Sequence, residues 1–194
     1  MSFFESIPQP PPPEPVRSPT PAWMRPDEVL PGAVPGESLL VRTDRVAVAL
    51  GSVRAYPNGF EFTLHVRTRE VSEFGIGGDP FEQRRRWLGQ QDEDHLRLGI
   101  LYADGRRAAT TGRPWPADDA GDEQLILMPD GSSADDHRWD GDFWVHPLPP
   151  DGEVAFVVSW PRFDVAETRV EFDGAVIREA AGRAVSLWPE QPEL

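Results

Sequence analysis

The sequence contains neither cysteine nor lysine, and arginine supplies all 19 of its basic side chains. The lack of cysteine excludes thiol nucleophiles, disulfides, iron–sulfur clusters and thiolate zinc sites. The lack of lysine excludes Schiff-base chemistry and the lysine-dependent phosphate sites of P-loop proteins and kinases. Lysine codons are rich in A and T, so a GC-rich bacterial genome is a sufficient explanation of this bias. The composition therefore removes several large enzyme classes.

Large apolar side chains are scarce in the first 36 residues, which hold 11 of the 22 prolines, including the run PQPPPPEP. Such a segment cannot bury enough apolar surface to offset the entropy lost on ordering it. The sequence therefore predicts a disordered, proline-rich and partly polyproline II tail over residues 1–36. Residues 37–194 are expected to form one folded domain.

The N-terminal sequence MSFFESIPQP also lacks the basic segment and apolar core of a signal peptide. No apolar run in the sequence is long enough to span a bilayer. Together with the lack of cysteine, these features predict a cytoplasmic location.

The formal net charge is −14, and much of it lies in one stretch. Between Trp115 and Asp142 there are nine acidic side chains and one basic side chain, Arg138, which gives a net charge of −8. Such a field repels nucleic acid and anionic membranes, and it attracts a basic protein partner or a cation. The alternative interpretation is a solubilising loop without a partner.

Strand patterns dominate the rest of the chain. In GFEFTLHVR, apolar and polar side chains alternate, as in a half-buried antiparallel strand whose inward residues are Phe60, Phe62, Leu64 and Val66. A Pro-Asn-Gly turn at 57–59 joins this segment to RVAVALGSVRAY and predicts a hairpin. HLRLGILY, QLILM and EVAFVVSW predict further strands.

Turn signals separate many of these segments. Asp-Gly occurs at 104–105, 130–131, 140–141, 151–152 and 173–174, and each pair favours a tight turn. Many short strands with glycine-rich turns predict an all-β fold, an antiparallel β-sandwich of eight or nine strands, either immunoglobulin-like or jelly-roll-like. A short helix is expected near residues 174–184, with a strand and a turn as the alternative.

A long segment, residues 74–95, lies between two predicted strands and carries the arginine triplet Arg84, Arg85 and Arg86. Long loops are often functional, so a lid or an anion-binding element is one interpretation and a mobile insertion is the other. Its GIGG sequence lacks the third glycine of a dinucleotide fingerprint.

The stretch DDHRWDGDFWVHP, residues 135–147, is the candidate ligand site. If it is extended, Phe143 and Val145 enter the core, and the opposite face carries Asp142, Trp144 and His146 in a row. An aromatic ring beside polar groups is typical of sugar-binding surfaces. The alternative is an acidic hairpin loop that leads into a half-buried strand and binds no ligand.

Three aspartates of the same stretch, Asp135, Asp136 and Asp140, form a candidate Ca²⁺ site, because Ca²⁺ takes several oxygen ligands. They do not match the EF-hand spacing, and no other cofactor is expected. The chain has four histidines but no H-E-x-x-H pair, and no serine lies in a G-x-S-x-G elbow. A catalytic triad or a carboxylate pair assembled by the fold stays open.

The segment WVHPLPPDGEVAFVVSWPRFDVAETRVEFDG, residues 144–174, resembles β-rich proteins of GC-rich bacteria that have no assigned function. The resemblance implies no activity and transfers no catalytic residue. The sequence as a whole favours a non-enzymatic interaction module, tethered by its proline-rich tail. Its partner is expected to be a protein, either a basic one on the acidic face or a domain that reads the tail. The alternative is a carbohydrate-binding or hydrolytic domain that uses residues 135–146.

Overall fold

The computed structural model describes residues 21–70, 79–81, 95–111 and 124–188. In this part of the chain there are twelve strands, nine of which have three residues or more. The strands are β1 (Val29–Leu30), β2 (Gly32–Ala33), β3 (Ser38–Arg42), β4 (Val46–Tyr56), β5 (Gly59–Thr68), β6 (Arg97–Tyr102), β7 (Arg107–Ala109), β8 (Ile126–Ala134), β9 (Arg138–His146), β10 (Glu153–Trp160), β11 (Val165–Asp173) and β12 (Val185–Ser186).

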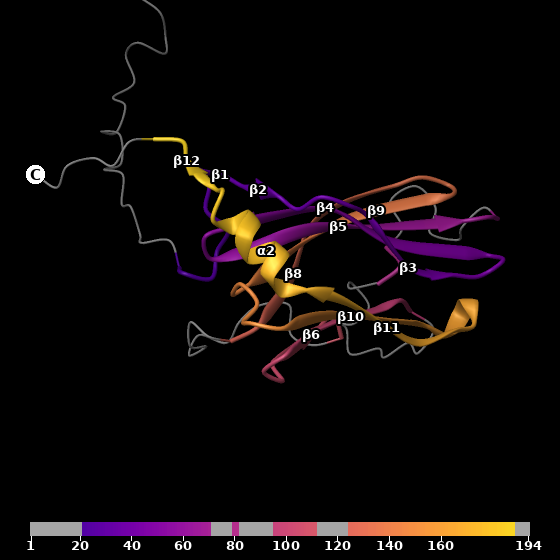
Figure 1. Cartoon of the computed structure of the whole chain (residues 1–194). Coiled ribbons are helices and arrows are strands. Elements are labelled where there is room, and N and C mark those ends of the chain that lie inside the picture. Colours follow the sequence, from indigo (N-terminus) through magenta and orange to yellow (C-terminus); the bar gives the residue numbers. More distant parts are fainter. Residues whose placement is uncertain (1–20, 71–78, 82–94, 112–123, 189–194) are drawn as a thin grey trace, which may run out of the picture.

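Two antiparallel sheets face each other, which confirms the all-β sandwich-like fold (Figure 1). The larger sheet has the order β2-β4-β5-β9-β8, and β3 pairs with the same edge of β4 as β2. The smaller sheet has the order β11-β10-β6-β7. A separate ribbon of β1 and β12 lies at one end of the molecule (Figure 1).

The core lies between the sheets and follows the alternation that the sequence predicts. Phe60, Phe62, Leu64 and Val66 of β5 are at most 1% exposed. The Phe62 ring stacks on Phe143 of β9 at 5.3 Å between centroids, and it meets Phe156 of the smaller sheet edge-on at 5.2 Å. Close-packed aromatic contacts of this kind join the two layers into one core.

The short helix α2 (Gly174–Ala181) confirms the helical alternative for residues 174–184 and covers one side of the sandwich (Figure 1). The Asp173 side chain caps it by accepting a hydrogen bond from the Ala175 N–H at 2.8 Å. Its buried side packs so closely on β2 that a Cβ at Gly32 would lie 1.8 Å from the Ala180 carbonyl oxygen, so only glycine fits there. The described residues contain no candidate membrane-spanning helix.

The turn signals had mixed outcomes. Asn58-Gly59, Asp104-Gly105 and Asp151-Gly152 lie at turns, as expected. Asp173-Gly174 instead begins α2, and 130–131 and 140–141 lie inside β8 and β9. The pairing of β8 with β9 overrides the local preference for a turn. The Asp-Gly dipeptide at 130–131 lies at a β-bulge, where the register shifts between Pro129 and Gly131.

Residues 21–36, which the sequence assigns to the tail, belong to the folded structure. β1 pairs with β12, β2 pairs with β4, and the Val34 N–H donates to the Val53 carbonyl at 2.9 Å. The expected domain boundary at residue 37 is therefore wrong for this part, because short pieces of backbone pair with strands far away in the sequence. The rest of the predicted tail, residues 1–20, lies outside the described residues.

Candidate functional site

The candidate site lies on β9, which is placed between β5 and β8 in the larger sheet. As predicted, Phe143 and Val145 point into the core and are 1% and 0% exposed. Asp142, Trp144 and His146 lie on the opposite side of the sheet, and they pair in register with β5 or β8. The predicted parity of the strand is therefore correct.

The expected exposed row is wrong for two of its three members. Trp144 is 2% exposed and His146 is 4% exposed. The His146 Nδ1 lies 2.7 Å from the Asn58 carbonyl oxygen. Only Asp142 is exposed, and it accepts a hydrogen bond from the Thr63 hydroxyl at 2.6 Å. No indole face is available here for stacking on a sugar.

The cover over Trp144 is residues 21–25, which we call the N-terminal strap. The Trp144 Nε1 donates to the Trp23 carbonyl at 2.8 Å, and its ring meets Tyr56 edge-on at 5.5 Å. The Asn58 amide donates to the carbonyls of Ala22 and Met24, both at 2.7 Å. These side chains satisfy strap carbonyls, so the strap is held by specific hydrogen bonds as well as by apolar contact.

A buried carboxylate anchors the end of the strap. Glu61 of β5 is 4% exposed and accepts hydrogen bonds from Arg25 at 2.7 Å and from the Tyr56 hydroxyl at 3.0 Å. The Arg54 Nε pairs at 2.6 Å with the Glu61 Oε1, which also accepts from Tyr56, whereas Arg25 is on Oε2 and also pairs with Asp130. Burial, together with the negative charge of Glu61 and the hydrogen bond to it, raises the pKa of Tyr56 to about 12. The phenol therefore stays protonated and remains a donor to Glu61 across the physiological range.

The three aspartates of the expected Ca²⁺ site do not converge. Asp140 contacts the His65 Nδ1 at 2.6 Å and accepts from Arg67 at 2.7 Å. Asp135 pairs with Arg138 at 3.1 Å, and Asp136 is exposed. In the described segments, no group of three or more histidine, aspartate or glutamate side chains is placed to hold a metal ion. The prediction of a shared site is wrong, because arginines occupy two of the three carboxylates.

Asp140 makes the stability of this face dependent on pH. Partial burial acts to raise its pKa, but the hydrogen bonds and positive charges of Arg67 and His65 outweigh burial and hold the pKa below its usual range. The carboxylate therefore stabilises the fold above about pH 4, and this contribution is lost as the pH falls through the lowered value. We expect Asp140→Asn to cost about 1 kcal/mol at pH 7.

Urea denaturation of the wild type and of Asp140→Asn between pH 7 and pH 2 measures this effect. The difference between the two proteins should shrink as the pH falls below about 4. Asp136→Asn, at an exposed position in the turn that precedes β9, is the control and should show little difference at any pH. A difference for Asp140→Asn that grows toward low pH would contradict the assignment.

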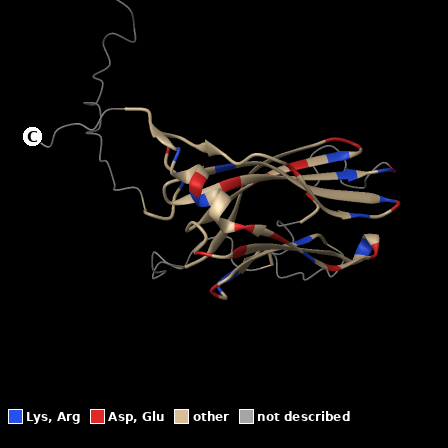
Figure 2. Cartoon of the chain, in the orientation of Figure 1, with Lys and Arg blue, Asp and Glu red and all other residues tan. Residues whose placement is uncertain are grey.

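The expected acidic face is largely neutralised where the structure describes it. Asp130, Asp135 and Asp140 each pair with an arginine. Segments of both signs are interspersed over both sheets (Figure 2). The remaining acids of the stretch, at positions 118, 119, 122 and 123, lie outside the described residues, as does the arginine triplet at 84–86.

An apolar strip that the sequence analysis missed lies on the ribbon of β1 and β12. Leu30 and Val185 are paired across the ribbon, and both are 58% exposed. The Leu187 N–H donates to the Glu28 carbonyl at 2.9 Å, so Leu187 continues the pairing and lies on the same face as Val185. Leu187 is 50% exposed and the adjacent Trp188 is 63% exposed. We call Leu30, Val185, Leu187 and Trp188 the ribbon patch.

Similarity to known proteins does not identify this site. Comparison with protein-family models, with curated proteins and with solved structures finds none for this chain. The sequence did hold one signal for the ribbon patch, since AVSLW places three large apolar residues within four positions directly after the expected helix and outside the predicted strands.

Proposed function

We propose that the chain is a protein-interaction module whose contact surface is the ribbon patch. The observation that carries this proposal is the exposure of four large apolar side chains close together, Leu30 and Val185 on the β1–β12 ribbon and Leu187 and Trp188 directly after β12. Large apolar side chains clustered on the surface of a soluble domain mark interaction sites, and tryptophan is among the residues that most often dominate the binding energy. The cytoplasmic location expected from the sequence belongs to the same proposal.

The partner we propose is a protein with an apolar centre and a basic rim. Asp27 and Glu28 directly precede β1, and the Glu28 carbonyl accepts from the Leu187 N–H, so two acidic residues adjoin the ribbon patch. The net charge of the chain is −14, so two copies repel one another at long range, whereas a basic partner is attracted. This charge argument favours a different protein over a second copy of the chain.

The test compares Trp188→Ala with Leu39→Ala. Leu39 is 51% exposed on β3 and lies outside the ribbon patch, so it is a matched control. Partners are captured from the native cell, identified, and measured again with purified components. We expect Trp188→Ala to weaken binding about 30-fold or more, with little loss of stability, because a tryptophan that becomes buried in an interface often contributes about 2 kcal/mol or more.

Leu39→Ala should bind as the wild type does, and binding should weaken as salt is added, since opposite charges at the rim are screened. Equal affinity of the wild type and Trp188→Ala for the purified partner would refute the proposal. Sedimentation that shows a dimer, abolished by Trp188→Ala, would replace the heterologous partner with a second copy.

A further inference from the structure

The contacts beneath the strap resemble those between a protein and a bound peptide. Three successive carbonyls of the strap, at positions 22, 23 and 24, accept hydrogen bonds from side chains of the larger sheet and its hairpin. The donors are the Asn58 amide, at 2.7 Å from two of them, and the Trp144 indole, at 2.8 Å from the third. Donors aimed at the backbone fit any peptide that adopts this turn, because every residue carries the same acceptor. We call Tyr56, Asn58, Glu61, Asp130 and Trp144 the strap site.

One charged side chain of the strap gives the strap site its selectivity. The Arg25 Nη1 donates to Glu61 at 2.7 Å and also to Asp130, so two carboxylates from different strands meet one guanidinium. Arginine has five N–H donors in a planar fork and stays charged, which suits it to bridge two carboxylates. The arrangement therefore favours an arginine at this position of the bound segment.

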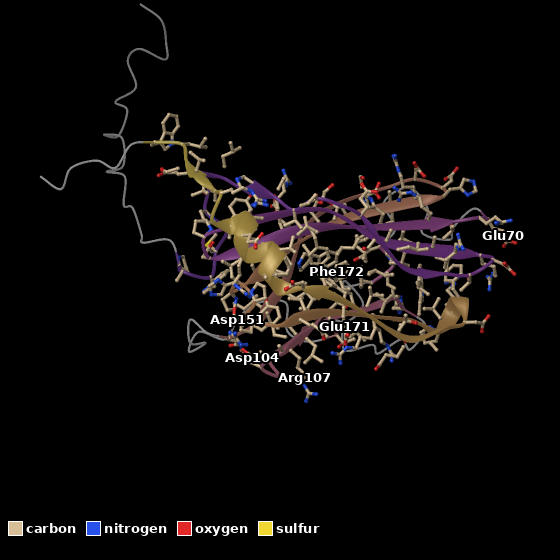
Figure 3. The ribbon with its side chains drawn as sticks, in the orientation of Figure 1. Glu70, Asp104, Arg107, Asp151, Glu171 and Phe172 are labelled. Carbon is tan, nitrogen blue, oxygen red and sulfur yellow. The ribbon has the colours of Figure 1, made fainter. Side chains whose placement is uncertain are left out.

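Other arginine–carboxylate pairs of the molecule differ from this one. Asp104, after β6, and Glu171, on β11, are labelled in Figure 3, and each is exposed and pairs at 2.7 Å with an arginine two residues away. Exposed pairs of this kind contribute little to stability. Glu61 is 4% exposed and bonds Arg25 across 36 residues of sequence. A buried carboxylate that receives an arginine from a distant segment is typical of recognition between separate pieces of chain.

The strap itself is only lightly attached. None of its residues belongs to a strand, and Pro21, Ala22 and Met24 are exposed. Residues 26–28 join it directly to β1. Segments with few buried side chains and no ladder pairing open at lower cost than the strands beneath them. Opening of the strap bares two aromatic rings, the buried carboxylate and the backbone-reading donors together.

We propose that the strap site is a peptide-binding site, that the chain fills it with its own strap, and that its external ligand is an arginine-bearing segment of another protein. The strap then acts as an intramolecular competitor. Its link of three residues to β1 keeps it at a high effective concentration, so an external segment binds well only when the strap is weakened or displaced. The strap site and the ribbon patch share no residue, so this inference stands apart from the proposed function.

The test uses the full chain and a fluorescent peptide with the sequence of residues 21–26, PAWMRP, capped at both ends. Arg25→Ala weakens the strap but leaves every residue of the strap site in place. We expect this variant to bind the peptide about tenfold more tightly than the wild type, or better, because loss of a charge-assisted hydrogen bond raises the fraction of open molecules. Fluorescence anisotropy measures both affinities.

The NMR signal of the Trp144 indole N–H reports where the peptide binds. It should move in Arg25→Ala, because the strap carbonyl is less often in place, and return toward its wild-type position when the peptide is added. A peptide with citrulline in place of arginine keeps the shape but lacks the charge, and it should bind Arg25→Ala about tenfold more weakly or worse. Glu61→Gln, added to Arg25→Ala, should remove most of this preference. Arg69→Ala, at an exposed arginine beyond the far end of β5, is the control and should bind as the wild type does.

Three outcomes would overturn the inference. These are the absence of peptide binding to Arg25→Ala at several millimolar, equal affinity of Arg25→Ala and the wild type, and equal affinity for the arginine and citrulline peptides. A dimer of the wild type that Arg25→Ala abolishes would overturn it as well, because the occupant would then be the strap of a second copy. NMR spectra of each variant without peptide confirm that it is folded, so a loss of binding is not mistaken for a loss of structure.

Discussion

Alanine in place of Trp144 is expected to lower the free energy of unfolding by about 3–5 kcal/mol. The side chain is 2% exposed, although it lies on the outer side of the sheet. Its ring packs against Tyr56, and a Cβ at Gly59 would lie 2.6 Å from it. Removal of the ring leaves a cavity beneath the strap and takes the hydrogen-bond donor from the Trp23 carbonyl.

Urea denaturation followed by circular dichroism measures this change. Asp142→Ala is the control, because Asp142 lies two residues earlier on the same face and is exposed, and we expect it to cost less than about 1 kcal/mol. Similar values for the two variants would mean that the strap does not cover Trp144 in solution. The same measurement would then restore the exposed row of side chains that the sequence predicts.

Removal of residues 1–36 is expected to lower the free energy of unfolding by about 4–6 kcal/mol. The deletion uncovers Trp144 and Tyr56, and exposure of a large buried side chain costs about 2 kcal/mol. It also removes Arg25 from the buried Glu61 and strips β2 from the edge of β4. Because Glu61 would lose this charged partner while its carboxylate stays buried, the loss adds to the cost in stability.

A comparison of the full chain with residues 21–194 and residues 37–194 tests this prediction. Deletion of residues 1–20 should leave stability almost unchanged, because that part of the sequence is rich in proline and has few large apolar side chains. The loss should appear only when residues 21–36 are removed as well. Equal stability of all three proteins would show that the strap contributes nothing to the fold.

Features encoded locally could be predicted from the sequence. The alternation in residues 59–68 gives the face of each side chain in β5, and the turn before it closes the hairpin with β4. The parity of Phe143 and Val145 in β9 was equally accessible, because a period of two depends only on neighbouring residues. The short helix was ambiguous in the sequence, since a segment of eight residues holds only about two turns of a pattern.

Features that depend on distant contacts could not be predicted. The strap reaches Trp144 across 121 residues, and nothing periodic in residues 21–25 marks them as a cover. Asp140 meets Arg67 across 73 residues, so the acidic stretch looked unpaired when it was considered alone. Trp144, which the local pattern places on the outer face, is buried by the strap. The charge of Asp140 is neutralised by Arg67 from another strand.

The β1–β12 ribbon also determines how the domain meets mechanical load. Its two pairs, Val29 with Ser186 and Leu30 with Val185, are antiparallel, so both chain ends leave from the same end of the ribbon. A force on the N-terminal side, however, meets the strap first, because residues 21–25 precede β1 and are bonded to Trp144, Asn58 and Glu61. The strap therefore shields the ribbon from tension, and its anchors load the long strands β5 and β9 directly. Only after the strap has detached would the ribbon pairs open one after the other and separate Leu30 from Val185.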